Sequence, residues 1–133
     1  MAKKILLIED DPQQIAIYEK AVKEAGFEIE SLKWGEEGLK RLEEIKSKKK
    51  EKPDLILLDL MLPRKSGFDI LKEIKADPKV KDIPVIILSN LAQEKEIEQG
   101  LALGAVDYLV KTDYSIQQVM EKIKKALERS QNN

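Results

Sequence analysis

Acidic side chains stand at two places in the chain where short nonpolar runs end. Glu9 and Asp10 follow the run that ends at Ile8, and Asp59 follows the run that ends at Leu58. Carboxylates gathered without a cation repel one another and take up protons, whereas Mg²⁺, a hard ion that prefers oxygen ligands, lets the same group stay ionised. If the fold brings these two ends together, the three acids predict a divalent metal site.

Two further residues complete a set that could handle a phosphoryl group. Ser89 and Lys111 each close a nonpolar run, one with a hydroxyl and the other with a cation. Lysine and Mg²⁺ offset charge on phosphoryl oxygens, a hydroxyl donates a hydrogen bond, and a carboxylate can attack phosphorus to form an acyl phosphate. Asp59 is the candidate nucleophile, because it directly follows a predicted strand and precedes a loop constrained by Pro63 and Gly67.

The elements that must position these residues alternate between strand and helix. The nonpolar runs 5–8, 55–58 and 85–88 are continuous, which is typical of parallel strands buried on both faces, and segments with a helical period of three to four residues lie between them. We predict strands at 4–8, 27–32, 54–58, 83–88 and 106–110, and helices at 12–25, 35–47, 66–76, 93–103 and 115–129.

Five strand–helix units with right-handed crossovers predict an α/β fold, with one doubly wound five-stranded parallel sheet between two helical layers. The flavodoxin-like strand order 2-1-3-4-5 is a common solution, and ligands of such folds bind at the carboxyl ends of the strands. Asp11 precedes Pro12, so we expect Asp11 to cap a helix rather than to bind metal. Ser115 with Gln118 predicts the start of the last helix.

Composition excludes several classes of function. The 133 residues contain neither cysteine nor histidine, which excludes thiol nucleophiles, Ser–His catalysis and zinc held by those residues. Lys and Arg number 24 against 25 Asp and Glu, so no overall charge attracts nucleic acid or an anionic membrane. No nonpolar stretch reaches the length of a signal peptide core or a membrane helix. We expect a single domain over 1–133, without an effector domain, in the cytoplasm.

In combination, these motifs resemble those of the response-regulator receiver family, also called CheY-like. The resemblance covers essentially the whole chain and implies a signalling switch rather than an enzyme, although such a domain assists its own phosphorylation and dephosphorylation. The matching positions are the acidic pair Glu9-Asp10, the phosphoacceptor loop Asp59-Leu60-Met61-Leu62-Pro63 through Gly67, the switch hydroxyl Ser89, and Leu103-Gly104-Ala105 through Lys111.

The resemblance also implies a donor and a metal. Asp59 would accept a phosphoryl group from a phosphohistidine on a separate sensor histidine kinase or phosphotransfer protein, which is consistent with a chain that has no histidine. Asp10, Asp59 and the backbone carbonyl of Met61 would bind Mg²⁺, and Glu9 would act through water. Lys111 would contact the phosphoryl group.

The family's switch and output are implied in the same way. Ser89 would contact the phosphoryl group, and burial of the aromatic Tyr108 would accompany the shift of Ser89. The fourth helix, fifth strand and fifth helix, around Glu94, Gln99, Tyr108 and Lys122, would bind a downstream protein or a second copy of the chain. We expect no direct contact with nucleic acid or a membrane.

Several residues depart from the family pattern. Thr112 stands where the family usually has a cis proline, so we expect a trans bond after Lys111, or strain. Asn90 stands where the family favours a small residue, which would slow access to the acceptor. Met61 and Leu91 are nonpolar and cannot orient a hydrolytic water, so we expect a long-lived phosphoryl state.

Three other functions are compatible with a fold of this kind, and two of them would require different residues at the site. A flavin or nucleotide protein of the same fold would need a Gly- or Ser/Thr-rich phosphate loop after the first strand, where Glu9, Asp10 and Asp11 stand. An Asp-based phosphatase would need a second acid at the position of Met61. A receiver-fold interaction module that is not phosphorylated, or a designed scaffold with the same motifs, is the main alternative.

Overall fold

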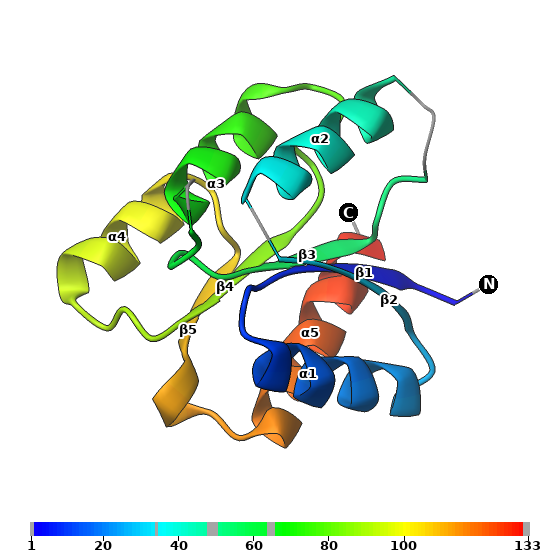
Figure 1. The fold of residues 1–133 in the computed structure, drawn as a ribbon, viewed down its shortest axis with the longest axis vertical. Helices are drawn as coiled ribbons and strands as arrows, with labels where there is room; N and C mark the ends of the chain where they lie inside the picture. The colour runs from blue at the N-terminus through cyan, green and yellow to red at the C-terminus, as the bar shows by residue number, and fades with distance from the viewer. Residues whose placement is uncertain (1, 34, 48–50, 64–65, 132–133) are drawn as a thin grey trace.

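The computed structural model describes residues 2–33, 35–47, 51–63 and 66–131. Strands and helices alternate through these ranges (Figure 1). The strands are β1 (Lys4–Ile8), β2 (Glu28–Leu32), β3 (Leu55–Leu58), β4 (Val85–Ser89) and β5 (Asp107–Val110). The α-helices are α1 (Pro12–Glu24), α2 (Gly35–Lys46), α3 (Gly67–Ala76), α4 (Glu94–Ala102) and α5 (Ile116–Gln131), and a short 3₁₀ helix, η1, covers Lys111–Asp113.

The described strands form one parallel sheet in the order β2-β1-β3-β4-β5. Helices α1 and α5 cover one face of this sheet, and α2, α3 and α4 cover the other (Figure 1). The predicted three-layer, doubly wound fold and its strand order are therefore confirmed. Because β1 lies between β2 and β3, the strand order reverses beside β1, which is where folds of this kind bind ligands.

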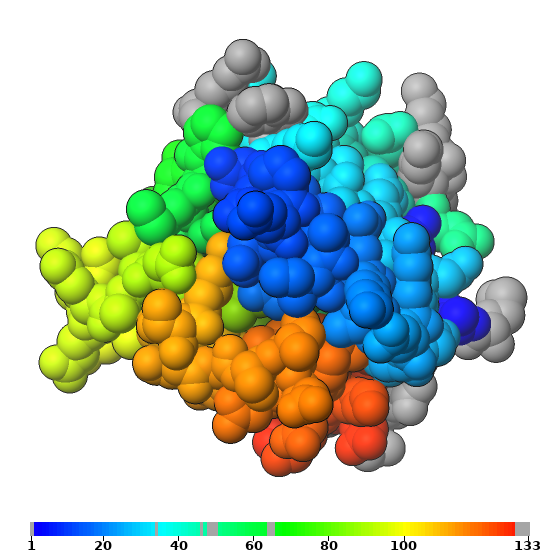
Figure 2. Space-filling view, turned by 60° about the horizontal axis from the view of Figure 1, so that its bottom comes forward, coloured from blue at the N-terminus to red at the C-terminus, as the bar shows by residue number. Residues whose placement is uncertain are grey.

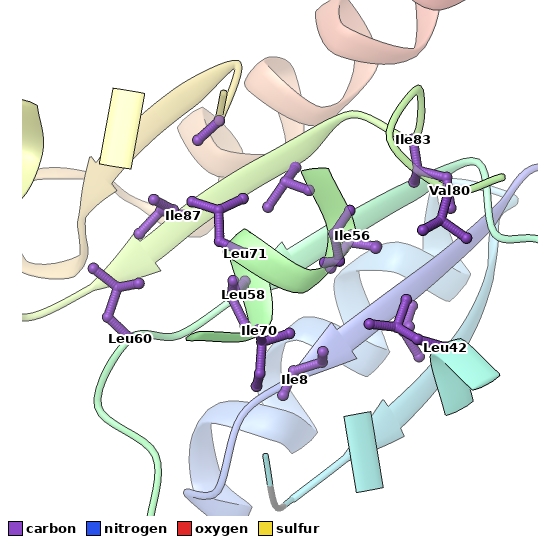
Figure 3. Close-up of a cluster of buried hydrophobic side chains, with 14 of the residues drawn as sticks. Ile8, Leu42, Ile56, Leu58, Leu60, Ile70, Leu71, Val80, Ile83 and Ile87 are labelled. Carbon is purple, nitrogen blue, oxygen red and sulfur yellow. The ribbon is translucent and has the colours of Figure 1, made fainter. Parts of the chain in front are cut away.

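Continuous nonpolar strands are explained by a core on each side of the sheet. Ile5 and Leu7 pack toward α1 and α5, whereas Leu6 and Ile8 pack toward the opposite helices. Figure 3 shows the second of these clusters, in which side chains of α2 and α3 meet those of β1, β3 and β4. An alternating strand would leave polar groups in one of the two cores, so both faces of β1 and β3 must be nonpolar.

The predicted helix caps position the loops at the carboxyl edge of the sheet. The Asp11 carboxylate accepts a hydrogen bond from the backbone N–H of Gln13 at 2.9 Å and begins α1. Ser115 and Gln118 cap each other's backbone N–H groups at 3.1 and 2.8 Å before α5. Both caps match the expected roles, so Asp11 belongs to the helix start.

The observed element boundaries lie within two residues of the predicted ones, and those of β1 are the same, but η1 was not predicted. It follows β5 directly and contains Thr112. Every peptide bond in the described ranges is trans, so the expected trans bond between Lys111 and Thr112 is confirmed. Within the same ranges, the helices are all too short or too polar to cross a membrane.

Candidate functional site

The carboxyl ends of β1 and β3 bring three acids together. β1 and β3 are paired in register with Ile8 opposite Leu58, and the N–H of Asp59 donates to the carbonyl of Ile8 at 3.0 Å. Glu9, Asp10 and Asp59 each offer a carboxylate oxygen, and these oxygens lie within 4.8 Å of one another. The predicted acidic cluster is therefore present at the predicted edge.

Lys111 reaches this cluster from the end of β5. Its ammonium donates to Oε1 of Glu9 and, at 3.1 Å, to Oδ2 of Asp59. Burial acts to lower the pKa of Lys111, but the hydrogen bond to Glu9 and the charge of Asp59 outweigh burial and raise the pKa above its ordinary value. The lysine is a fixed cation between two carboxylates that are almost completely buried.

Burial makes the ionised form of Glu9 unfavourable. Burial, with the charge of Asp59, raises the pKa of Glu9 from 4.5 to about 7, although Lys111 opposes the shift. One ammonium does not balance three carboxylates. The set of oxygen donors and its excess of negative charge fit a hard divalent cation such as Mg²⁺.

The loop after β3 fixes the orientation of Asp59. The N–H of Met61 donates to Oδ1 of Asp59 at 3.0 Å, so Asp59 accepts one hydrogen bond on each oxygen. A Cβ atom on Gly67 would lie 2.4 Å from the carbonyl oxygen of Asp59 and 2.6 Å from Cα of Leu60. Position 67 must therefore be glycine for α3 to begin this close to the acceptor loop. The carbonyl of Met61 as a metal ligand stays a prediction.

The hydroxyl groups of Ser89 and Tyr108 both form hydrogen bonds with the backbone of Leu91. Ser89 is the last residue of β4 and fully buried, and its hydroxyl accepts from the N–H of Leu91 at 3.3 Å. Tyr108 is 7% exposed, and its hydroxyl donates to the carbonyl of Leu91 at 2.7 Å. Burial, reinforced by the charge of Glu96, raises the pKa of Tyr108. Tyr108 thus lies inside the predicted output face, while Glu94 and Gln99 are exposed on it.

Tyr18 is a neighbour of the site that was not among the candidate site residues. It lies on α1, is 6% exposed, and its hydroxyl donates to the side chain of Gln14 at 3.2 Å. Burial raises the pKa of Tyr18, and Lys111 lowers it. In Figure 2, α1 in blue borders the orange segment after β5, which explains this proximity.

The residues that depart from the family pattern lie in the segments that directly follow β3, β4 and β5. Asn90 and Thr112 are exposed, Leu91 is half-buried, and Met61 is 54% exposed. Met61 therefore presents a nonpolar surface beside the carboxylates. How these four residues affect the speed of phosphorylation stays a prediction.

Comparisons with known proteins agree with this arrangement. The family model of the response regulator receiver domain matches residues 5–124. The phosphate regulon transcriptional regulatory protein PhoB of Rhizobium meliloti is 33% identical over 98% of this chain and 54% of its own length. The PhoP regulator of alkaline phosphatase synthesis from Bacillus subtilis is also 33% identical, over 98% of this chain and 51% of its own length. The chain thus spans about half the length of these curated relatives.

Solved structures show the same fold. The crystal structure of the phosphorylated cyanobacterial phytochrome response regulator RcpA has a TM-score of 0.81 and 34% identity, covering 94% of this chain and 91% of that one. The Mn²⁺-bound form of the response regulator Rcp1 has a TM-score of 0.74 and 29% identity, and the match covers 98% of this chain and 90% of that one. With the acidic cluster, the lysine and the strand order already in place, the chain belongs to the response regulator receiver domains of two-component systems.

Proposed function

We propose that this receiver domain is a phosphorylation-dependent switch whose phosphoacceptor is Asp59. The observation that carries the proposal is the bond from the Lys111 ammonium to Oδ2 of Asp59, beside the acidic pair of β1. This lysine holds positive charge where the oxygens of an incoming phosphoryl group would lie. The phosphorylated state of the similar protein RcpA supports the same use of the fold.

The donor is a phosphohistidine on a sensor histidine kinase or a phosphotransfer protein. An oxygen of Asp59 attacks the phosphorus, the bond from phosphorus to the donor's imidazole nitrogen breaks, and the electron pair stays on that nitrogen. The product is an acyl phosphate on Asp59. Lys111 neutralises the phosphoryl oxygens, and the hydroxyl of Ser89 turns to donate a hydrogen bond to one of them.

The acidic cluster would hold Mg²⁺ during this step. Asp10, Asp59 and the carbonyl of Met61 would be ligands, and Glu9 would act through water. When bound, the ion offsets charge on the attacking and transferred oxygens. Mn²⁺ in the similar protein Rcp1 supports a divalent ion in this family's fold.

The domain transfers a signal and is not an enzyme with a substrate of its own. Met61 and Leu91 flank the acceptor with nonpolar side chains, which cannot orient a water for hydrolysis. We therefore expect the phosphoryl group to be lost slowly. Rapid loss of the label from phosphorylated protein in Mg²⁺ would contradict this expectation.

Output passes through binding of a protein partner to α4, β5 and α5. Glu94 and Gln99 supply exposed polar groups on α4, and Lys122 is half-buried on α5. Tyr108 is buried beneath this face, tied to the loop that follows Ser89. Phosphorylation would shift the populations of two arrangements of this loop and change what the face binds, either a downstream protein or a second copy.

Phosphorylation by a small donor tests the proposal without the unidentified kinase. Protein is incubated with acetyl phosphate and Mg²⁺, and the intact mass is measured for the wild type, Asp59→Asn and Asp113→Asn. Asp113 is an exposed aspartate at the same edge of the sheet, so it is the matched control. We expect one phosphoryl adduct on the wild type and on Asp113→Asn, and none on Asp59→Asn or in EDTA.

The alternative is an interaction module that keeps the fold without phosphorylation. An unmodified wild type, under conditions in which Mg²⁺ binding is measured directly, would favour that module. An adduct that persists in Asp59→Asn would instead move the acceptor to another residue. Either result contradicts the proposed role of Asp59.

A further inference from the structure

A cavity of about 320 Å³ lies at the end of the sheet opposite the acidic cluster. It is bordered by the starts of β4 and β5 and by the second half of α5. Pockets for small organic ligands have volumes of roughly 300–1,000 Å³, so this cavity has the size of a small metabolite. The acids of the phosphoacceptor site do not line it.

The base of the cavity is nonpolar. Pro84 directly precedes β4, and Ile86 lies in that strand. Val106 directly precedes β5, and Ala126 lies on α5. Val106 is 49% exposed, although it is a nonpolar residue directly before β5. Ala126 has a small side chain, so α5 adds little bulk to this part of the lining.

The rim of the cavity is rich in positive charge. Lys75, Lys122, Lys125 and Arg129 line it, against the two acids Asp82 and Asp107, so the excess is two positive charges. The whole chain has a net charge of −1. The net charge of the residues that line the cavity is therefore positive, whereas the net charge of the whole chain is negative.

Two of these cations already have partners. Lys75 donates to the carbonyls of Lys81 and Ile83 at 2.9 and 3.2 Å. Lys122 lies 3.7 Å from Asp107, whose other oxygen accepts from the N–H of Tyr108 at 2.9 Å. These bonds hold the walls of the cavity in place.

The side chains of Lys125 and Arg129 form no ion pair or hydrogen bond with another residue in the described ranges. They are four residues apart on α5, so they lie on the same side of the helix, and both are exposed. Their charges are free to bind an anion at the open side of the cavity. A phosphate dianion beside two such cations would gain two charge-assisted contacts.

We propose that this cavity binds a small organic phosphate, with a nonpolar ring over Ile86, Val106 and Ala126 and the phosphate beside Lys125 and Arg129. A mononucleotide combines these two parts. The site is separate from Asp59, and its occupancy does not depend on the proposed phosphorylation.

Calorimetric titration with adenosine monophosphate in EDTA at low ionic strength tests the site. We expect saturable binding that weakens about 5- to 30-fold in the double variant Lys125→Gln/Arg129→Gln, because each exposed cation contributes a modest amount. The double variant Lys20→Gln/Lys40→Gln removes the same charge from exposed positions of α1 and α2. It should bind like the wild type.

A second variant separates shape from charge. Ala126→Leu keeps every charge and fills the base of the cavity, so we expect it to weaken binding of adenosine monophosphate more than binding of inorganic phosphate. Asp59→Asn should leave both affinities unchanged. The proposal is overturned if the wild type shows no saturable binding, or if both double variants bind equally. It is also overturned if binding is lost in Lys111→Met but kept in Lys125→Gln/Arg129→Gln.

Discussion

The hydroxyl of Tyr108 on β5 donates to the backbone carbonyl of Leu91, which lies 17 residues earlier in the loop after β4. The same residue, Leu91, donates its N–H to the hydroxyl of Ser89. A single loop residue therefore connects the buried aromatic ring to the hydroxyl at the phosphoacceptor edge. Movement of Ser89 toward a phosphoryl group would disturb the position of Tyr108 through this residue.

Removing the hydroxyl of Tyr108 should weaken this connection. We expect Tyr108→Phe to lower the free energy of unfolding by about 1–2 kcal/mol, because the carbonyl of Leu91 loses its donor while the ring stays in place. Urea denaturation measures the change. Tyr114→Phe is the control, since Tyr114 is a half-buried tyrosine that packs on the opposite core. Equal losses in the two variants would contradict the prediction.

Gly100 on α4 leaves the space that the ring of Tyr108 occupies. A Cβ atom at position 100 would lie 2.6 Å from Cδ1 of Ile87 and 3.1 Å from Cδ2 of Tyr108. Gly100→Ala should cost about 1–3 kcal/mol through overpacking, partly offset by the better helix propensity of alanine. Ile87→Val removes the closest atom, so the double variant should recover about 1 kcal/mol relative to additivity. Additive changes in urea denaturation would refute this steric account.

The raised pKa of Glu9 predicts how stability depends on pH in metal-free protein. The unfolded chain ionises Glu9 near pH 4.5, whereas the folded protein resists ionisation until about pH 7. The contribution of Glu9 to folding is therefore full below pH 4.5 and is lost as the pH rises to 7. The total loss is about 3 kcal/mol.

Urea denaturation in EDTA across about pH 5 to 8 measures this effect. The free energy of unfolding of the wild type should fall relative to that of Glu9→Gln between about pH 5 and pH 7, and the difference should level off above about pH 7. Glu24→Gln, at an exposed position on α1, should run parallel to the wild type. A constant difference between Glu9→Gln and the wild type would show that Glu9 ionises normally.

Neighbouring aspartates offer a sharp test of the metal site. Mg²⁺ that binds only the folded state should raise the melting temperature, with about 2.7 kcal/mol of stabilisation at a hundred times the dissociation constant. Asp10→Asn should lose most of this shift. Asp11→Asn should keep it, because Asp11 caps α1 and asparagine caps a helix equally well. Equal shifts in the two variants would remove Asp10 from the metal site.

The sequence predicted the sheet and the acidic cluster for the same reason. Continuous nonpolar runs mark buried parallel strands, and the residue after each run must lie at the ligand-binding edge. Glu9, Asp59 and Lys111 follow such runs, so their convergence could be predicted. Their individual bonds could not be predicted, because the hydrogen bonds from Lys111 to both Glu9 and Asp59 depend on side-chain geometry after folding.

Residues outside these runs gave weaker signals. Tyr18 fits the nonpolar period of α1, and nothing in that period shows that its ring lies within electrostatic reach of Lys111. The basic cavity was missed because Lys75 and Arg129 lie on different helices and far apart in the sequence. Among 24 basic residues, those that meet across a cavity are identified only by the packing of α5 against the sheet.

The span of chain between Lys111 and its partners has a consequence for biosynthesis. Lys111 is 102 residues from Glu9 and 52 from Asp59, and it follows the edge strand β5. A chain emerging from the ribosome has both acids long before it has their counterion. A step that depends on this lysine would therefore have to wait until β5 has been synthesised and has joined the sheet.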